Sequence, residues 1–292
     1  MSLIELANPQ APVTLDFFMD GPAFENGIPV HIMVNGIGGA QSLLDRAYLG
    51  LAGRRRFTSE ERTHFFLVSK GVNQGSLDTV FDIILTGVQT SFPVLGALGP
   101  AGIWEYAKQA YELLKIAYDA VAKDEQPRFE WNADKSVVQV NTGNQTNIYN
   151  APVYNIAQLS QTTYVDVSRM IDRRDVDHFR ISEKKSKIGI ELAANDARIF
   201  LATIKIEEMP IEIECEIFDF NKFDDTGKVK VGKGQPLPEN NYRFEVIGAQ
   251  NDRPYIEAML KQTVKLKCLK ETSTDPLSGE KVVGLQVISI AA

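Results

Sequence analysis

The stretch IEIECEIFDF, residues 211–220, decides the fold class of the second half of this chain. Its apolar side chains recur at every second position, which puts Ile211, Ile213, Cys215 and Ile217 on one face of an extended strand and glutamates on the other. A period of two indicates a half-buried strand. VKLKCLK and VVGLQVISI repeat the pattern after a turn-rich segment. We therefore expect residues 166–292 to form a mostly antiparallel β-domain, either a barrel or a sandwich.

The first 76 residues combine extended and helical patterns. VTLDFFMDG and IPVHIMVNG are β-rich runs separated by Gly, Pro and Asn, which favours two strands. GGAQSLLDRAYLGLAG then places apolar residues at helical spacing, and RTHFFLVSKG favours a further strand. We expect a small α/β domain over residues 1–76. With the β-rich second half, this makes the whole chain an α+β protein.

The longest uncharged stretch is IILTGVQTSFPVLGALGPAGIW, which covers 22 residues from Ile83 to Trp104. That length suits a helix that spans a bilayer, but Pro93, Pro100 and four glycines would break it. An amphipathic helix follows as far as Lys123. We expect residues 77–123 to form a hydrophobic helical hairpin, which either contacts a membrane or lies in a buried core. The expected membrane contacts are Ile83, Leu85, Phe92, Leu95, Leu98, Ile103 and Trp104.

Residues 124–165 are dense in Asn, Gln and Thr, with Val, Ile and Tyr at intervals. One interpretation is a low-complexity linker. The other is a connector that contributes strands and turns at NTGN, residues 141–144. The apolar positions that would supply such strands are Val138, Val140, Ile148, Tyr149, Val153 and Ile156.

Composition limits the classes of function. The 292 residues carry a formal net charge of −7, which argues against a protein that coats nucleic acid over its whole surface. Cys215 and Cys268 each lie in an alternating run, which favours buried structural thiols over a disulfide. The N-terminus has no pattern of a secretory signal. We expect the protein in the cytoplasm or on the inner side of the cytoplasmic membrane.

The most basic neighbourhood runs from Asp45 to Lys70. Its arginines could complement a helix dipole, or they could bind a phosphate or an oligonucleotide, because guanidinium groups contact phosphates in a bidentate manner. A weaker candidate follows in DRRDVDHFRISEKKSK. The candidate ligand-binding residues are Arg46, Arg54, Arg55, Arg56, Arg62, Lys70, Arg173 and Arg174.

No motif indicates catalysis. NGIGG, residues 35–39, lacks the spacing of the phosphate-binding glycine loops, and a plain strand-to-helix turn explains it better. His31, His64 and His178 lack the spacing of metal ligands, so we expect neither a metal nor a cofactor. One enzymatic alternative stays open: a metal-dependent hydrolase or nuclease whose carboxylates converge only in the fold. The candidates are Asp16, Asp20 and Asp45.

The chain has a recognisable layout. The stretches that define it are QSLLDRAYLG, WEYAKQAYELLKIA, VVQVNTGNQTNIYN and the alternating C-terminal region. This layout resembles bacterial anti-phage membrane effectors such as the channel subunits of Hailong systems. The resemblance implies a homo-oligomer with a cationic surface for an oligonucleotide and a pore-forming segment. Our leading hypothesis is a non-enzymatic, membrane-associated effector controlled by a nucleotide, an oligonucleotide or a protein partner. The alternative is a soluble interaction or accessory protein with a buried hairpin.

Overall fold

The computed structural model describes residues 13–25, 27–73, 77–86, 93–142, 145–184, 188–201, 204–248 and 250–291. Helices and strands both occur throughout, which confirms the α+β class. The chain divides into two compact units, Met1–Leu201 and Ala202–Ala292. The segments 1–76, 77–123 and 124–165 that the sequence suggested all fall within unit 1, while 166–292 contributes to both units.

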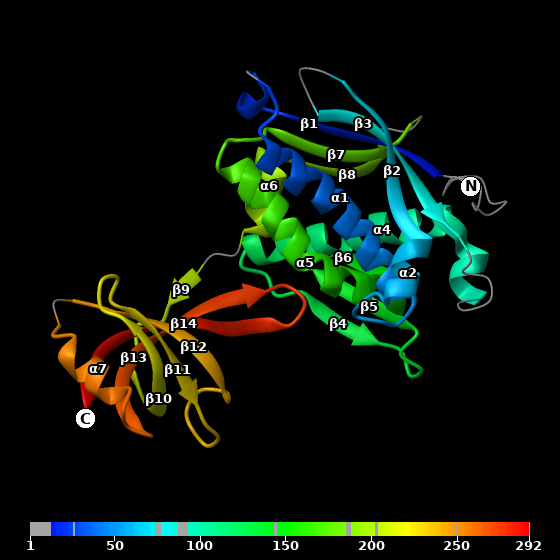
Figure 1. The fold of residues 1–292 in the computed structure, drawn as a ribbon. Coiled ribbons are helices and arrows are strands. Elements are labelled where there is room, and N and C mark those ends of the chain that lie inside the picture. Colours follow the sequence, from blue (N-terminus) through cyan, green and yellow to red (C-terminus); the bar gives the residue numbers. More distant parts are fainter. Residues whose placement is uncertain are drawn as a thin grey trace. The chain divides into compact units, whose positions relative to one another are not determined.

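Unit 1 is built on a five-stranded antiparallel sheet in the order β2-β3-β1-β7-β8. Helices pack on one face of it (Figure 1). On that face Phe17 of β1 contacts the rings of Phe81 and Phe179, each with its centroid 5.4 Å away. These rings come from three neighbouring strands and are buried. The strands are β1 (Val13–Asp20), β2 (Phe65–Asn73), β3 (Leu77–Leu85), β7 (His178–Glu183) and β8 (Gly189–Ala193).

Helix α1 (Val30–Leu51) corrects the N-terminal prediction. IPVHIMVNG is helical from Val30 onward, and NGIGG lies inside the helix, so its amides do not form a phosphate-binding loop. The glycines act as contact points: a Cβ on Gly36 would meet Met19 of β1, and a Cβ on Gly39 would meet Val167. Close packing thus outweighs the low helix propensity of glycine. A 3₁₀ turn (η2, Pro22–Phe24) precedes α1, and a short helix (α2, Ser59–His64) follows it.

The predicted hydrophobic hairpin is a strand followed by a kinked helix. Residues 77–85 form β3, which pairs with β1 on one side and β2 on the other. The last three residues of β3, Ile83 to Leu85, are all buried, and a short apolar run of this kind cannot be distinguished from a buried helix by sequence periodicity. Helix α4 (Pro93–Ala122) then kinks at Gly99, where φ is 61°, next to Pro100. The elbow at Gly99 and Pro100 is therefore confirmed, but the first arm of the hairpin is wrong.

Among the described residues, no helix has both the length and the apolar content that a membrane crossing requires. This finding corrects the prediction of a membrane ion channel.

The Asn- and Thr-rich connector is ordered as a small antiparallel sheet in the order β4-β5-β6. Val138 and Val140 of β5 are completely buried, as expected for strand residues. Val153 and Ile156 instead lie in the long helix α5 (Ala151–Asp172), which begins with Pro152 in its first turn. The remaining elements of unit 1 are β4 (Arg128–Trp131), β5 (Val137–Thr142), β6 (Gln145–Asn150) and α6 (Ala194–Phe200).

Unit 2 contains a closed barrel. Its strands are hydrogen-bonded in the order β10-β11-β12-β14-β13, and β13 pairs back with β10. All of these pairs are antiparallel except β12 with β14. Strand β9 pairs with residues 271–273 of β13. The elements are β9 (Ile204–Ile206), β10 (Ile211–Asn221), β11 (Thr226–Val231), β12 (Asn240–Val246), α7 (Arg253–Ala258), β13 (Val264–Asp275) and β14 (Gly279–Ala291).

Strand β10 closes the barrel because it pairs with two strands, β13 and β11. Ile211 to Cys215 pair with β13, and Cys215 to Asn221 pair with β11. An irregularity between Ile217 and Asp219 bends the strand between its partners. The alternating side chains Ile213, Cys215 and Ile217 point into the core. With α7 between the third and fourth barrel strands, this topology is that of the OB-fold, a five-stranded Greek-key barrel.

Candidate functional site

Three of the predicted ligand-binding cations are engaged by carboxylates of unit 1. Arg54 forms an ion pair with Glu61 at 2.9 Å, and Lys70 pairs with Asp82 at 2.5 Å. Arg62 donates two hydrogen bonds to Asp45, at 2.8 and 2.7 Å. Its guanidinium also lies 4.0 Å from the centroid of the Phe57 ring. The arginine contacts connect α1, the following loop and α2, and the Lys70–Asp82 pair connects β2 and β3, so all are internal contacts of the fold.

The other predicted arginines are not brought together. Arg55 and Arg56 are exposed in the loop after α1, and Arg46 is half-buried on α1. Arg173 and Arg174 follow the C-terminus of α5. Helices α1 and α5 run in opposite directions, because Gly50 faces Ile156 while Gly39 faces Val167. The two basic segments therefore lie at opposite ends of this helix pair and do not form one anion site.

The predicted membrane-contact residues lie largely in the core of unit 1. Ile83 and Leu85 are buried in β3, and Ile103 and Trp104 are buried in α4. Leu98 is half-buried beside Gly102, one helical turn along α4. Phe92 and the side chain of Leu95 lie outside the described residues.

The carboxylates of the hydrolase alternative do not converge. Asp16 lies on β1, Asp20 contacts His178 Nδ1 at 2.8 Å, and Asp45 contacts Arg62. His64 contacts Thr86 at 3.1 Å, while His31 is exposed on α1. Within the described ranges, no three His, Cys, Asp or Glu side chains are placed to hold a metal ion. The residues proposed for that alternative therefore share no site.

Both cysteines are buried, free thiols in the barrel core. Burial raises the pKa of Cys215 to about 12, with a smaller contribution from the nearby Cys268. Burial likewise raises the pKa of Cys268 to about 11. Since the thiolate is the reactive form, neither side chain suits nucleophilic chemistry.

The barrel presents basic side chains on the outer face of β11 and β12. Lys228 and Lys230 alternate with the buried Val229 and Val231, so both lysines point outward. Lys228 is directly opposite Arg243 of β12. An ion pair of 2.9 Å holds Lys228 to Asp219. Across the described residues, neither Lys230 nor Arg243 has an ion pair within 4 Å, although the exposed Glu216 of β10 lies directly opposite Lys230.

Two aromatic side chains are exposed next to this face. Phe223, in the loop between β10 and β11, is 85% exposed, and Phe218 at the irregularity of β10 is 43% exposed. The ammonium of Lys222 lies 5.2 Å from the centroid of the Phe223 ring. The loop itself is ordered by local hydrogen bonds, because the Phe223 amide donates to Asn221 Oδ1 at 3.0 Å. We call Phe218, Lys222, Phe223, Lys230 and Arg243 the barrel face.

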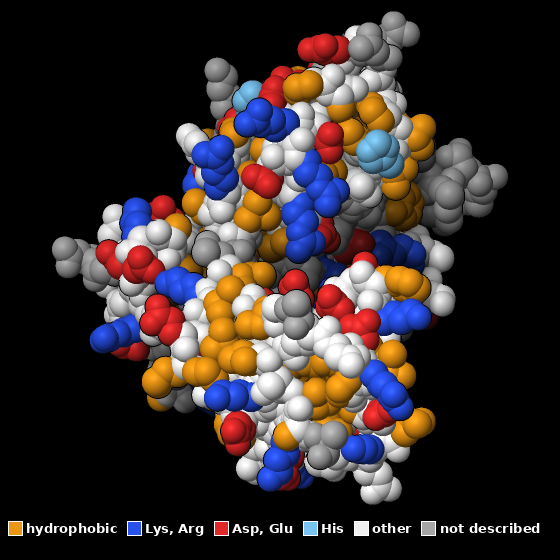
Figure 2. Space-filling view, turned by 90° about the vertical axis from the view of Figure 1, so that its left-hand side faces the viewer, with side chains coloured by type: hydrophobic (Ala, Val, Ile, Leu, Met, Phe, Trp, Pro, Cys, Tyr) orange, Lys and Arg blue, Asp and Glu red, His pale blue; other side chains and the backbone are white. Residues whose placement is uncertain are grey.

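No predicted site residue belongs to the barrel face. The signal was present in GKVKV, residues 227–231, where lysines alternate with valines, and in the lone aromatic of NKFDD, residues 221–225. Neither pattern is a motif. On the side of the molecule that Figure 2 shows, basic side chains are interspersed with acidic and apolar ones, so charge alone does not mark a site.

Comparisons with protein-family models, with curated proteins and with solved structures found no match. The similarity of unit 2 to the OB-fold therefore rests on strand order, strand direction and the position of α7.

Proposed function

We propose that the barrel of unit 2 binds single-stranded oligonucleotides on the barrel face. OB-folds bind oligonucleotides and oligosaccharides on their second and third strands and on the adjoining loops. In this barrel the second and third strands are β11 and β12, and the first connecting loop carries Lys222 and Phe223. The fold alone does not determine function, so the proposal also needs suitable side chains at these positions.

The observation that carries the proposal is the exposed ring of Phe223 beside a basic strand face. Phe223 is 85% exposed and lies in the loop between the first and second barrel strands, where OB-folds contact their ligands. Aromatic rings that stack on bases contribute about 1–3 kcal/mol per base, and lysines and arginines nearby follow the phosphate backbone. Lys222 lies against the ring of Phe223, and Lys230 and Arg243 lie on the adjoining strands β11 and β12.

An oligonucleotide partner agrees with the hypothesis from the sequence, but the proposed binding site lies on the barrel and not at the arginines of residues 46–62. Arg54 and Arg62 in the basic neighbourhood of α1 and α2 are held in ion pairs, whereas the barrel face combines exposed aromatic side chains with basic ones. Homo-oligomerisation, a protein partner and an effector role in anti-phage defence stay predictions that rest on the layout of the chain.

Fluorescence anisotropy of the full chain with a labelled oligothymidine and a labelled oligouridine tests the proposal. We expect saturable binding that weakens as salt is raised, since phosphate contacts release counterions. Phe223→Ala should weaken binding by about fivefold or more, because one stacking platform is lost. Phe223→Trp should retain binding.

Lys230→Ala and Lys261→Ala form a matched pair of charge changes. Lys230 belongs to the barrel face, whereas Lys261 is exposed after α7. Lys230→Ala should weaken binding and reduce the salt slope by about 0.7–1, while Lys261→Ala should leave both unchanged. Equal effects of the two lysine changes, or full binding by Phe223→Ala, would contradict a site on the barrel face.

A further inference from the structure

Strand β6 forms one edge of the small sheet of unit 1, because among the described residues it pairs with β5 alone. The amide of Ala151, directly after β6, donates to the carbonyl of Ser136 at 2.8 Å. Hydrogen-bonded pairs alternate along an antiparallel ladder, so every second residue of β6 bonds to β5. The residues between them turn their backbone N–H and C=O groups to the free edge. They are Thr146, Ile148 and Asn150.

The edge of β6 lacks the features that usually protect an edge strand from pairing. Such features are charged side chains, proline, bulges and very short strands. Residues 145–150 contain neither a charged side chain nor a proline, and the register of β5 with β6 shows no irregularity. The other described strands that end a sheet each have a protecting feature. These features are the register shift in β2, Glu130 in β4, Glu191 in β8 and the length of only three residues in β9.

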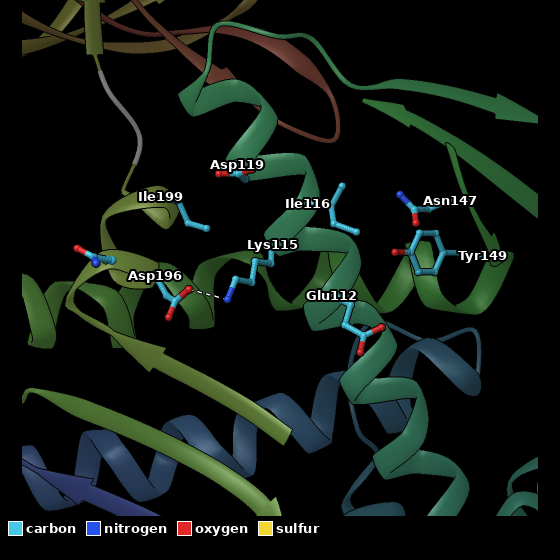
Figure 3. Close-up of a pocket in the computed structure, with 9 residues that line it drawn as sticks. Glu112, Lys115, Ile116, Asp119, Asn147, Tyr149, Asp196 and Ile199 are labelled. Atoms are coloured by element: carbon cyan, nitrogen blue, oxygen red, sulfur yellow. Dashed lines mark ion pairs between the residues drawn. The ribbon is translucent and has the colours of Figure 1, made fainter. Parts of the chain in front are cut away.

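A pocket of about 640 Å³ opens beside this unprotected edge. In Figure 3 a stripe of α4 lies between Asn147 and Tyr149 of β6 on one side and Asp196 of α6 on the other. Of the described residues of the small sheet, only those of β6 line the pocket. A further strand next to β6 would therefore lie over the α4 stripe. The lining residues are Glu112, Lys115, Ile116, Asp119, Asn147, Tyr149, Asn195, Asp196 and Ile199.

Ile148 is an apolar residue on the outer face of β6. Its side chain is 69% exposed, and it alternates with Asn147 and Tyr149, which face the pocket. In an antiparallel pairing of two β6 strands about a two-fold axis at Ile148, the two isoleucines lie directly opposite each other. Thr146 of each strand then faces Asn150 of the other. Apolar cross-strand pairs stabilise a sheet, and this pairing brings no like charges together.

We propose that the β6 edge binds the β6 edge of a second copy of this chain, so that two small sheets continue as one. Strand addition takes its affinity from main-chain hydrogen bonds and its specificity from alternate side chains. The outward backbone groups of Thr146, Ile148 and Asn150 supply the hydrogen bonds. The uncharged sequence and its two-fold complementarity favour a second copy over an unrelated peptide.

The same pairing also fills the pocket. Since alternate side chains of a strand lie on one face, the partner's Asn147 and Tyr149 come to lie over the α4 stripe. The partner's Tyr149 brings an aromatic ring to Ile116 and a hydroxyl donor to the carboxylates of the stripe. The site in each protomer is thus completed by the other protomer. It is independent of the oligonucleotide site proposed for unit 2.

Sedimentation velocity of the full chain over a range of protein concentrations tests the proposal. We expect a reversible dimer. Ile148→Lys should raise the dissociation constant of the dimer by about tenfold or more, because like charges replace an apolar pair. Ile148→Pro should also weaken the dimer, since it removes an N–H that points to the free edge and is not bonded to β5.

Ile188→Lys is the matched control, because Ile188 is 70% exposed and precedes β8, outside the β6 edge. This variant should sediment as the unchanged protein does. A short bismaleimide should cross-link Ile148→Cys but not Ile188→Cys as a dimer, since the natural cysteines are buried. A monomer at every concentration, a dimer that persists in Ile148→Lys, or equal effects of the two lysine changes would each overturn the proposal. Circular dichroism of the variants separates loss of pairing from misfolding.

Discussion

The indole nitrogen of Trp104 donates a hydrogen bond to Glu183 Oε1 at 2.9 Å, and this contact ties the middle of α4 to the end of β7. Lys108, one turn further along α4, contacts the same carboxylate at 3.4 Å. Trp104 is 1% exposed, so its aromatic ring belongs to the core of unit 1. The residue that suggested a membrane interface in the sequence is an anchor between a helix and a sheet.

Trp104→Phe should lower the free energy of unfolding by about 2–3 kcal/mol, because it removes a hydrogen bond and leaves a cavity. Urea unfolding followed by circular dichroism measures the loss. Trp131→Phe is the matched control, since Trp131 is 39% exposed on β4. If both variants lost the same free energy, the anchoring role of Trp104 would be refuted.

The glycines of α1 support a second prediction. A Cβ on Gly50 would lie 2.4 Å from Ile156 Cγ1 and 3.3 Å from the Ile156 backbone, which cannot move aside cheaply. Gly50→Ala should therefore destabilise the protein by about 1–3 kcal/mol, although alanine favours a helix. Gly38→Ala, on the open face of the same helix, meets nothing within 4 Å. It should stabilise the protein by up to about 1 kcal/mol. Thermal unfolding of the two variants should shift in opposite directions.

The same glycines explain one limit of prediction from this sequence. Local propensity in IPVHIMVNGIGG favours a strand and a turn, yet the segment is helical from Val30, because Gly36 and Gly39 allow α1 to approach β1 and α5. Tertiary packing overrides propensity in such cases. The alternation at residues 211–220 was more informative, since burial on one side of β10 requires a period of two.

The candidate sites were less accessible to prediction than the fold class. The pocket of unit 1 combines Glu112, Tyr149 and Asp196, which come from three separate elements and form no local pattern. The three arginines at residues 54–56 suggested an anion site because their charge can be seen in the sequence. The sequence does not show that Arg54 forms an ion pair with Glu61. Whether an arginine is free or paired depends on the fold.

The barrel thiols imply a pH dependence. The ordinary thiol pKa is 9.0, and burial raises it to about 12 for Cys215 and about 11 for Cys268. Below pH 9 both states of the protein keep these protons, so stability is not affected. Above that pH the unfolded chain ionises first, and stability should fall by up to about 1.4 kcal/mol per pH unit for each thiol.

Urea unfolding at several alkaline pH values measures this slope, and labelling with a thiol reagent in native buffer should be slow. Cys215→Ala should flatten the slope above pH 9 relative to the unchanged protein. Rapid labelling of both thiols in the native state, or an unchanged slope in Cys215→Ala, would be inconsistent with thiols buried in the barrel core.

The last prediction concerns the arginine run after α1. Burial of Glu61 acts to raise its pKa, but hydrogen bonds from Thr58 and the charge of Arg54 outweigh it, so the pKa of Glu61 is lowered. A lowered pKa stabilises the protein above the ordinary value of 4.5, and that contribution is lost as pH falls through the folded-state pKa. Arg54→Ala should lower the free energy of unfolding at neutral pH by about 1 kcal/mol and move acid unfolding to higher pH. Arg55→Ala, which changes the same charge at an exposed neighbour, should leave both unchanged. Identical acid unfolding of the two variants would mean that the ion pair of Arg54 with Glu61 does not stabilise unit 1.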